Sequence, residues 1–430
     1  MGIALGALGT VARADDKAPP APDEALPELK PEPKVQPVVV GVMGTGGRGT
    51  ELAVEYATRP GVTVRYVCDV DADRAARAGA AVAARQDKEI DGPKAVGDFR
   101  RILDDKNVDV LVVAAADHWH APAAILACAA GKHVYVEKPC CHNPHEGELL
   151  VAAARKYNRI VQHGTQRRSW PKNVEAVELV KSGGVGRVLF SRGWYNNVRP
   201  SIGRGKEMPA PAKLDFALWQ GPAPERPFRD NILHYNWHWF WHWGTGECGN
   251  NGVHALDVCR WGLGVDYPRR VTAGGGRYYF DDDQETPDTH SVTYDFGDKM
   301  IVWEGRSCHP RGFEGSAFGI AFYGDAGTVV IDGGGYKVLD PNGKVTKEDS
   351  GPGGNAEHVQ NFLDCVRGEG KLNAEIEEGY KSALLCHLGN IAYRTGHTLN
   401  LDPETHRVVG DPEAEALWRR EYRKGWEPKV

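Results

Sequence analysis

The sequence predicts an α/β protein in which a doubly wound parallel sheet is followed by an α+β domain with a large open, mostly antiparallel sheet. Two observations predict this fold class. From Val38 to about residue 165, buried-strand patterns alternate with helical patterns, which is the order of a parallel sheet with helices on both faces. After about residue 172, strand candidates follow one another without regular helices between them, as in an antiparallel sheet.

The first part of the chain carries the elements of the parallel sheet. Apolar runs predict strands at 38–42, 62–68, 108–115, 133–136 and 159–163. Helical patterns lie between them, at 50–58, 73–85, 99–103, 121–130 and 146–157. Together these elements predict one domain over residues 38–165.

The second part carries the elements of the open sheet. Strands are predicted at 188–195, 270–280, 290–296, 299–304, 317–323 and 327–332. Two amphipathic helices are predicted near the end, at 356–366 and 378–394. We expect residues 166–430 to form a domain that binds substrate and carries subunit contacts.

The N-terminal residues differ in composition from the rest. Residues 1–11 are small and apolar, and Ala12-Arg13-Ala14 has the small-x-small form of a signal-peptidase site. No positively charged region precedes them, and 15–37 is rich in Pro, Ala, Glu and Lys. We therefore interpret residues 1–37 as a signal-peptide remnant and disordered linker, and expect export to the periplasm. The alternative is a cytoplasmic protein with an alanine-rich tail.

Composition excludes some functional classes. The formal net charge is −6, from 52 Lys and Arg against 58 Asp and Glu, and no basic run is present, so no nucleic-acid partner is expected. No stretch after the first residues approaches the ~20 apolar residues of a membrane span. Cys140, Cys141, His142 and His145 resemble metal ligands, but their spacing fits no zinc pattern and no metal is predicted.

A glycine-rich turn directly follows the first strand. Gly44-Thr45-Gly46-Gly47-Arg48-Gly49 fits G-x-G-x-x-G and opens the first helix, which is the context of a Rossmann dinucleotide site. Gly44 permits the tight turn, Gly46 lets the backbone approach a pyrophosphate, and Gly49 allows close helix–strand packing. The helix N-terminus supplies free N–H donors. The whole turn is therefore predicted to bind a dinucleotide.

An acidic residue ends the second strand. Asp69 is placed to accept hydrogen bonds from the adenosine ribose hydroxyls, and a carboxylate there disfavours a 2′-phosphate. We therefore predict NAD rather than NADP, although Arg74 lies close enough in the sequence to keep NADP as the alternative.

The fourth strand ends in Glu137-Lys138-Pro139. In an open α/β sheet, ligands bind beyond the carboxyl ends of the strands, so Lys138 is expected in the ligand cleft. An ammonium there can stabilise an alkoxide that forms on the substrate before hydride leaves. The alternative is a surface lysine that merely follows a strand.

The run 133–139, the glycine turn and Ala116-Asp117-His118-Trp119-His120 together resemble the Gfo/Idh/MocA oxidoreductase family. That family includes glucose–fructose oxidoreductase and inositol dehydrogenase. The resemblance extends from Val38 to the last helix, and Glu-Lys-Pro is its most specific motif. It implies an NAD(P)-dependent enzyme that acts on sugars, cyclitols or glycosides, with Lys138 as the catalytic lysine.

The resemblance also implies further site residues. Gln166 and Arg168 lie in the segment that enters the second domain, where a polar side chain often meets substrate or nicotinamide. Residues expected to line the cofactor cleft are Ala115, Asp117, His120 and Glu137. For Asp117 and His120 the alternative is an N-cap and a helix-start histidine.

Many family members carry Asp-x-x-x-His on a helix, with the histidine as acid/base. His254 matches that histidine, but Asn250 stands where the aspartate is usual. The i, i+4 spacing puts both on one helical face. Asn250 can still bind a substrate hydroxyl, and Asp257 is expected either to orient His254 or hold a sugar hydroxyl, or to serve as a structural helix cap or core hydrogen-bonder. With a reference pKa near ~6.5, His254 is predicted to take the hydroxyl proton.

An aromatic stretch at 234–243 contains His234-Tyr235-Asn236-Trp237-His238-Trp239-Phe240-Trp241-His242-Trp243. Aromatic faces stack on sugar rings, so Trp237 and His238 are predicted to contact a carbohydrate. The alternative is a buried aromatic cluster or a subunit contact.

The sequence therefore predicts an NAD-dependent dehydrogenase that transfers hydride from a ring hydroxyl of a sugar, cyclitol or glycoside. One alternative is a redox-assisted glycosidase that oxidises, eliminates and re-reduces with tightly bound NAD. Another is a dinucleotide-binding sensor without catalysis. The resemblance also implies a homo-oligomer, a dimer or tetramer.

Overall fold

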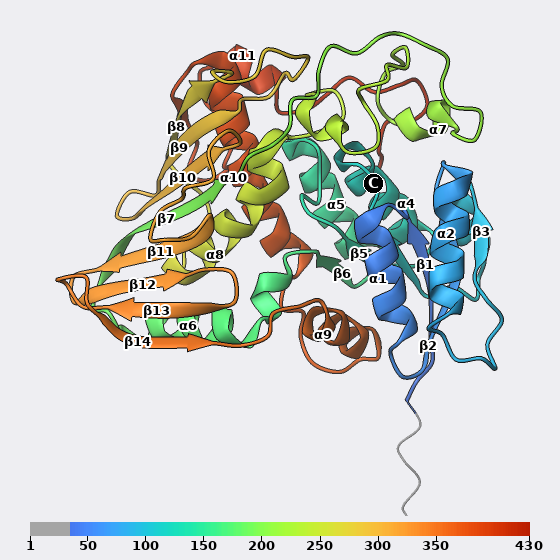
Figure 1. Ribbon diagram of the computed structural model, residues 1–430, viewed down its shortest axis with the longest axis horizontal. Coiled ribbons are helices and arrows are strands. Elements are labelled where there is room, and N and C mark those ends of the chain that lie inside the picture. The colour runs from blue at the N-terminus through green and yellow to red at the C-terminus, as the bar shows by residue number, and fades with distance from the viewer. Residues whose placement is uncertain (1–34) are drawn as a thin grey trace, which may run out of the picture. The chain divides into compact units, whose positions relative to one another are not determined.

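The computed structural model describes residues 35–430 (Figure 1). Almost all of the expected signal-peptide remnant and linker therefore lies outside the described residues, and export and oligomeric state stay predictions. Along the part of the chain that is described, no helix combines the length and apolar character that crossing a membrane requires.

The first sheet has six parallel strands in the order β3-β2-β1-β4-β5-β6. Their bounds are β1 Val38–Met43, β2 Val62–Cys68, β3 Lys94–Val96, β4 Val110–Val113, β5 His133–Val136 and β6 Val161–His163. The strand order reverses between β1 and β4, which creates the switch point where open α/β sheets bind ligands. The sequence analysis missed β3, a short strand with two exposed residues and no apolar run.

Helices cover both faces of this sheet. Those of the first domain are α1 Gly47–Ala57, α2 Ala72–Ala83, α3 Arg100–Asp104, α4 Asp117–Ala129 and α5 Pro144–Lys156. Side chains of α1 and α2 pack with Val40 and Val112 on one face, and those of α4 and α5 pack with Leu111 and Val113 on the other. The helix α9 (Ala356–Val366) returns from the second domain to join α1 and α2. The doubly wound parallel sheet predicted from the sequence is confirmed.

The second sheet has nine strands in the order β14-β13-β12-β11-β7-β10-β9-β8-β15. Their bounds are β7 Val188–Asn196, β8 Arg270–Gly276, β9 Thr289–Asp295, β10 Met300–Arg306, β11 Phe318–Gly324, β12 Gly327–Ile331, β13 Gly335–Leu339, β14 Val345–Ser350 and β15 Leu399–Asn400. Only β7 and β10 pair in parallel, so the prediction of a mostly antiparallel sheet is confirmed. The sequence analysis missed β13, β14 and β15.

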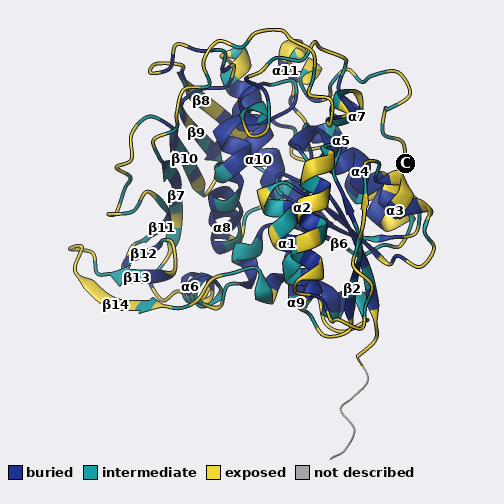
Figure 2. Cartoon of the chain, turned by 45° about the vertical axis from the view of Figure 1, so that its right-hand side comes forward, coloured by how far each residue is buried: buried dark blue, intermediate teal, exposed yellow. Residues whose placement is uncertain are grey.

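Figure 2 shows α8 and α10 as the most deeply buried helices of this domain and β14 as an exposed edge. These helices are α8 Val253–Leu263 and α10 Ile376–Thr395, and the remaining ones are α6 Pro171–Lys181, α7 Phe216–Gln220 and α11 Pro412–Ala416. Because α8 packs on β7 and β11 while α10 packs on α5 and β8, the two helices join the sheets.

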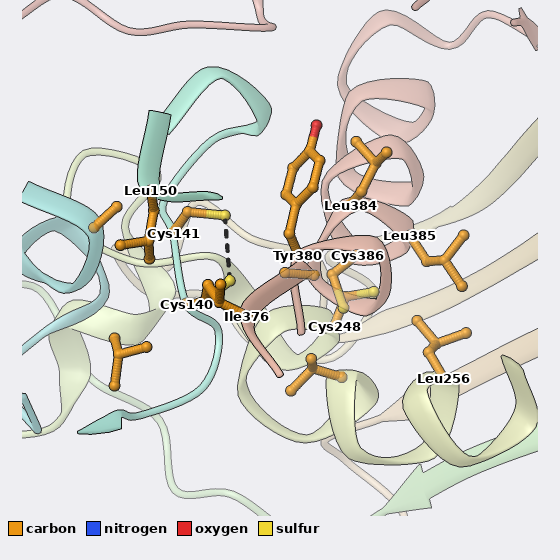
Figure 3. Close-up of a cluster of buried hydrophobic side chains, with 14 of the residues drawn as sticks. Cys140, Cys141, Leu150, Cys248, Leu256, Ile376, Tyr380, Leu384, Leu385 and Cys386 are labelled. Carbon is orange, nitrogen blue, oxygen red and sulfur yellow. Dashed lines mark hydrogen bonds between the residues drawn. The ribbon is translucent and has the colours of Figure 1, made fainter. Parts of the chain in front are cut away.

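A buried cluster with four cysteines fills the junction of α5, α8 and α10 (Figure 3). Its labelled members are Cys140, Cys141, Leu150, Cys248, Leu256, Ile376, Tyr380, Leu384, Leu385 and Cys386. The Sγ atoms of Cys140 and Cys141 lie 3.9 Å apart. Within residues 35–430, no three His, Cys, Asp or Glu side chains gather as a metal site. All four thiols are buried in the core, and Cys141 Sγ also lies 3.4 Å from His387 Nε2.

Candidate active site

A cavity of about 610 Å³ lies at the carboxyl ends of the parallel strands. One wall comes from the Rossmann sheet and the other from residues 214–254 of the second domain. Backbone hydrogen bonds from Ala72 to Lys213 and from Asp215 to Val70 tie the second wall to the loop after β2. The predicted site residues that line the cavity are Gly44, Gly46, Gly47, Arg48, Asp69, Ala115, Asp117, His120, Glu137, Lys138, Gln166, Trp237, His238, Asn250 and His254.

The glycine turn has the shape that a pyrophosphate needs. Gly44 has φ of +84°, and a Cβ there would lie 2.5 Å from the Ala115 nitrogen. A Cβ at Gly49 would lie 1.8 Å from the Gly44 oxygen, so Gly49 serves the close packing of the turn and not the cavity lining. No side chain caps the start of α1, so its first N–H groups stay free for an anion.

Asp69 holds the turn and faces the cavity. Its Oδ2 accepts from the Thr45 N–H at 2.8 Å, and its Oδ1 accepts from the Asp71 N–H at 3.0 Å. Thr45 is buried behind the turn, so it supports the carboxylate without lining the cavity. Burial raises the pKa of Asp69. Arg74 also lines the cavity close to the glycine turn. Its Nη1 would lie 2.8 Å from a Cβ placed on Gly46.

Asp117 and His120, which follow β4 in the chain, hold the loops around the cavity in place. Asp117 is buried, its Oδ2 accepts from the Thr245 hydroxyl at 2.6 Å, and burial raises its pKa. The His120 ring lies between two backbone carbonyls, with Nδ1 2.6 Å from the Pro139 oxygen and Nε2 2.9 Å from the Ala115 oxygen. Both side chains therefore fix the loops that frame the cavity.

Arg48 and Glu137 form a partly buried ion pair that lines the cavity. Arg48 Nε donates to Glu137 Oε1 at 2.8 Å. Burial opposes the charge on Glu137, yet Arg48 and Lys138 hold its pKa below the ordinary value. A second Arg48 nitrogen, Nη1, donates to Asn355 Oδ1 at 2.9 Å, so the pair anchors the glycine turn to both domains.

The Lys138 ammonium is held by Asn250. Nζ donates to the Asn250 backbone oxygen at 2.8 Å and to its Oδ1 at 3.2 Å. The Asn250 Nδ2 in turn donates to Tyr235 Oη at 3.2 Å and to Glu247 Oε1 at 3.3 Å. Among the described residues, no carboxylate pairs directly with Lys138, because Glu137 is paired with Arg48 and Glu247 with Arg199. The ammonium is therefore oriented but not neutralised.

His254 faces the same cavity with a pKa lower than the sequence analysis assumed. Burial and the charges of Lys138 and Arg167 hold its pKa well below the ordinary value, so the ring is neutral at neutral pH. Its buried Nδ1 has no partner among the described residues. A regular helix was expected to align it with Asn250, whereas residues Cys248–Gly252 form a π-helical turn that leads into α8. Both side chains still reach the cavity.

The aromatic stretch is divided among three surroundings. Tyr235, Trp237 and His238 line the cavity, and the Trp237 and His238 rings stack with centroids 3.6 Å apart. Burial lowers the pKa of His238 to about 3. Trp239, Phe240 and Trp243 are buried core residues, and Trp241 and His242 line a different cavity. The stretch therefore serves as both cavity wall and core, which joins the two interpretations of its sequence.

The structure does not bring Arg168 and Asp257 to the cavity. Arg168 Nε donates to both Asp257 carboxylate oxygens, at 3.0 and 2.9 Å, and Ser382 Oγ donates to Oδ1 at 2.7 Å. Both residues are buried between η1 (Gln166–Ser169), α8 and α10. Arg168, expected to meet substrate or nicotinamide, thus lies in a buried ion pair away from this cavity, and Asp257 has the core hydrogen-bonding role that was the alternative for it, because it lies on the inner face of α8.

The sequence analysis missed several lining residues, most of them in the second wall. Cavity-lining residues that it did not select include Phe99, Trp119, Leu214, Leu218, Trp219, His234 and Tyr235. Leu214 to Trp219 lie on and around α7, inside a long irregular connection with no motif of its own. For this wall, the main indication in the sequence was the high density of aromatic residues at 234–243.

These residues fit a bound dinucleotide. The cavity offers an uncapped helix N-terminus beside glycines, and Gly47 has no heavy atom within 4 Å of where a Cβ would stand. Asp69 can accept from ribose hydroxyls, and Lys138 and His254 border the far end.

Two family models match this chain. The model of the oxidoreductase family's NAD-binding Rossmann fold matches residues 38–165, and that of its C-terminal alpha/beta domain matches residues 194–428. The chain belongs to the Gfo/Idh/MocA oxidoreductase family. Its first domain is the family's NAD-binding Rossmann domain, as the sequence predicted.

Curated relatives resemble parts of the chain. It is 33% identical over 198 residues to a glycosyl hydrolase family 109 protein of Saccharopolyspora erythraea, covering 45% of this chain and 42% of that protein. It is 35% identical over 171 residues to an inositol 2-dehydrogenase of Rubrobacter xylanophilus, covering 38% and 46%. A levoglucosan dehydrogenase of Pseudarthrobacter phenanthrenivorans is 29% identical, covering 37% and 41%. The chain thus spans less than half of the length of these relatives.

Solved structures share the whole architecture at low identity. The WlbA dehydrogenase of Bordetella pertussis, solved with NADH and UDP-GlcNAcA, has a TM-score of 0.62 at 21% identity, covering 85% of this chain and 99% of its own. An aldose-aldose oxidoreductase of Caulobacter crescentus has a TM-score of 0.64 at 18% identity, covering 85% and 100%. These likenesses confirm the two-domain fold.

Proposed function

We propose that this protein is an NAD-dependent dehydrogenase that oxidises a ring hydroxyl of a sugar, cyclitol or glycoside. The observation that carries the proposal is the Lys138 ammonium, which is oriented by Asn250 and is free of a carboxylate partner beside the neutral His254 ring. The inositol and levoglucosan dehydrogenases among the relatives support the substrate class.

Lys138 would hold the substrate hydroxyl. Two of its three N–H donors go to Asn250, which leaves one for a substrate oxygen. Because no carboxylate neutralises the ammonium, its charge can stabilise the alkoxide that forms as the hydroxyl proton leaves. A fixed donor aimed at such a developing oxyanion typically contributes ~10²–10³-fold in rate.

His254 would accept the hydroxyl proton. Its lowered pKa keeps the ring unprotonated at neutral pH and ready to accept, while the nearby Lys138 charge discourages protonation before substrate arrives. The C–H carbon of the substrate loses a hydride, its O–H loses a proton to the imidazole, and a carbonyl results. Bound NAD⁺ supplies the two-electron hydride acceptor.

Trp237 and His238 would form the sugar-facing wall. Their stacked rings offer an apolar face for the C–H side of a ring. Gln166 lies on the same cavity, and its buried Oε1 has no partner among the described residues, so it can accept from a second substrate hydroxyl.

The test is a spectrophotometric assay of purified protein with NAD⁺ and a panel of sugars, cyclitols and glycosides. We expect NADH absorbance to rise with one class, and to be lost in Lys138→Met and His254→Phe. Arg407→Gln, a surface arginine paired with Glu148, is the matched control and should keep full activity. Absence of NADH with every compound, while NAD⁺ binds, would contradict the dehydrogenase, and absence of aglycone release as well would favour a sensor.

A redox-assisted glycosidase is the second candidate, favoured by the similarity to the glycosyl hydrolase family 109 protein. Such an enzyme oxidises a ring carbon, removes the acidified neighbouring proton to expel the aglycone, and returns the hydride, so no net NADH forms. Aryl glycosides separate the two candidates. Release of aglycone without net NADH, together with NAD that copurifies, identifies the glycosidase.

A further inference from the structure

A second cavity, of about 410 Å³, lies on the other side of the aromatic stretch. Its walls are the start of α5, the last turns of α10 and the segment after α11, with Trp241 and His242 between them. No residue lines both this cavity and the cofactor cavity. A hydrogen bond from Thr245, on this side, to Asp117 connects the two.

Arg420 brings a guanidinium into this cavity that is attracted by the Glu146 carboxylate but not hydrogen-bonded to it. Its three nitrogens donate only to neutral acceptors: Nη1 to His142 Nδ1 at 3.2 Å, Nη2 to the His242 oxygen at 3.1 Å and Nε to the Glu421 oxygen at 3.2 Å. Within residues 35–430 it forms no salt bridge. Burial lowers the pKa of Arg420, which means that the site as it stands disfavours its charge.

His142 presents a buried donor without a partner. Arginine can only donate, so the His142 Nδ1 that receives Arg420 is unprotonated. Burial and Arg420 hold the pKa of His142 well below its ordinary value, so the ring is neutral and its proton is on Nε2. That buried Nε2–H has no acceptor among the described residues.

Asn143 presents a second such donor. Its Oδ1 accepts from the Glu146 N–H at 3.0 Å, which fixes the orientation of the amide and leaves Nδ2 as the donor. Nδ2 is buried and has no partner within the described residues. Two adjacent residues of the cavity wall thus offer unmet N–H groups next to a guanidinium.

Arg394 extends the positive charge to the rim. It projects from α10, stacks over Trp241 at 5.2 Å from the ring centroid, and makes no salt bridge with a described residue. Three of the nearby carboxylates have partners, whereas the Glu421 carboxylate, which also lines the cavity, has none among the described residues. Glu225 pairs with Arg423, Glu285 accepts from the Trp241 N–H at 2.8 Å, and Glu146 accepts from the His142 N–H and the Tyr422 hydroxyl.

We infer that this second cavity binds a small oxyanion, a carboxylate or phosphate group of a polar metabolite, between Arg420, His142, Asn143 and Arg394. The two buried groups without partners, His142 Nε2 and Asn143 Nδ2, are both donors beside a guanidinium, and buried donors of this kind are satisfied in native proteins. The inference is independent of the proposed reaction, because it uses none of the cofactor-cavity residues.

The test is calorimetric titration of the full-length protein, saturated with NAD, at constant ionic strength. Inorganic phosphate and malonate are the two probes, and malonamide is the uncharged match of malonate. We expect one or both anions to bind saturably, about tenfold more weakly in Arg420→Gln (about 1.4 kcal/mol) and about threefold more weakly in Arg394→Gln. Arg407→Gln should bind as the parent does.

The probes also identify the chemistry. Binding of phosphate alone assigns a phosphoryl ligand, and binding of malonate alone assigns a carboxylate ligand. Arg394 is exposed, so Arg394→Gln keeps the test valid if Arg420→Gln fails to fold, which circular dichroism would reveal. Absence of saturable binding of either anion, equal binding of malonamide, or unchanged affinity in the arginine variants overturns the inference.

Discussion

The two walls of the cofactor cavity are built on different physical principles. On the Rossmann wall, every functional side chain follows the carboxyl end of a parallel strand, as Asp69 follows β2 and Lys138 follows β5. On the opposite wall, Leu214 to Asn250 lie on a long irregular segment and a π-helical turn. The first wall is determined by local order along the chain, and the second only by how distant segments pack.

Two arginine–carboxylate pairs sharpen the contrast. Arg48–Glu137 lines the cavity and links the glycine turn to the loop after β5. Arg168–Asp257 has equally short contacts but is buried away from the cavity. Similar charge pairs therefore serve binding in one wall and domain cohesion behind the other, and burial relative to the cavity distinguishes them.

The largest expected effect is on kcat, and it concerns Lys138, which lies where the two walls meet. Lys138→Met removes the ammonium that Asn250 orients, so kcat should fall by ~10²–10³-fold. The affinity for NAD, measured by fluorescence quenching, should change little because the glycine turn and Asp69 are untouched. A variant that kept its kcat would show that Lys138 is a surface lysine and not part of the reaction.

The second effect is on stability, and it tests the buried Arg168–Asp257 pair. Asp257→Ala leaves the buried Arg168 guanidinium with only its longer contact to Glu378, at 3.6 Å, which should destabilise the fold by ~3–5 kcal/mol in urea unfolding. Lys213→Gln breaks the exposed pair with Asp73 and should cost less than ~1 kcal/mol. If Asp257→Ala instead kept its stability but lost substrate affinity, the sequence-based assignment of Asp257 to the substrate would be restored.

A smaller effect tests the turn of the Rossmann wall. Gly44→Ala puts a Cβ against the Ala115 backbone at positive φ, so thermal unfolding should show a loss of ~1–3 kcal/mol. Gly47→Ala is the matched control, since its Cβ would meet no atom within 4 Å, and it should be close to neutral. Equal losses in both variants would argue against a special conformation at Gly44.

The smallest effect concerns the opposite wall. Asn250→Asp introduces a carboxylate beside Lys138, which should offset the charge that lowers the pKa of His254. The His254 pKa should therefore rise toward its ordinary value, and the acidic limb of kcat/KM should move to higher pH. Histidine NMR titration measures the first change directly, and an unchanged titration would show that burial alone sets this pKa.

Sequence patterns predicted most of the Rossmann wall. The bounds of β2 and β5 are as expected, and the positions of the glycine turn, Asp69 and Lys138 follow from them. The regular elements of the second sheet were also found where apolar alternation is strong, as in β7 and β12. The short or exposed strands β3, β13, β14 and β15 were missed because they lack that alternation or are too short to show it.

By itself, the amino-acid sequence determined the fold class, the dinucleotide turn and the lysine at the strand end. It could do so because strand–turn–helix order and glycine spacing are local properties that specify the backbone nearby. Only the tertiary structure decided that Asp257 is buried with Arg168, that Asn250 holds Lys138, and that the aromatic stretch is shared between core and cavity. Those outcomes depend on contacts between residues about 90 or more apart in the chain. No local sequence pattern predicts which helix faces or loops will pack together over that separation.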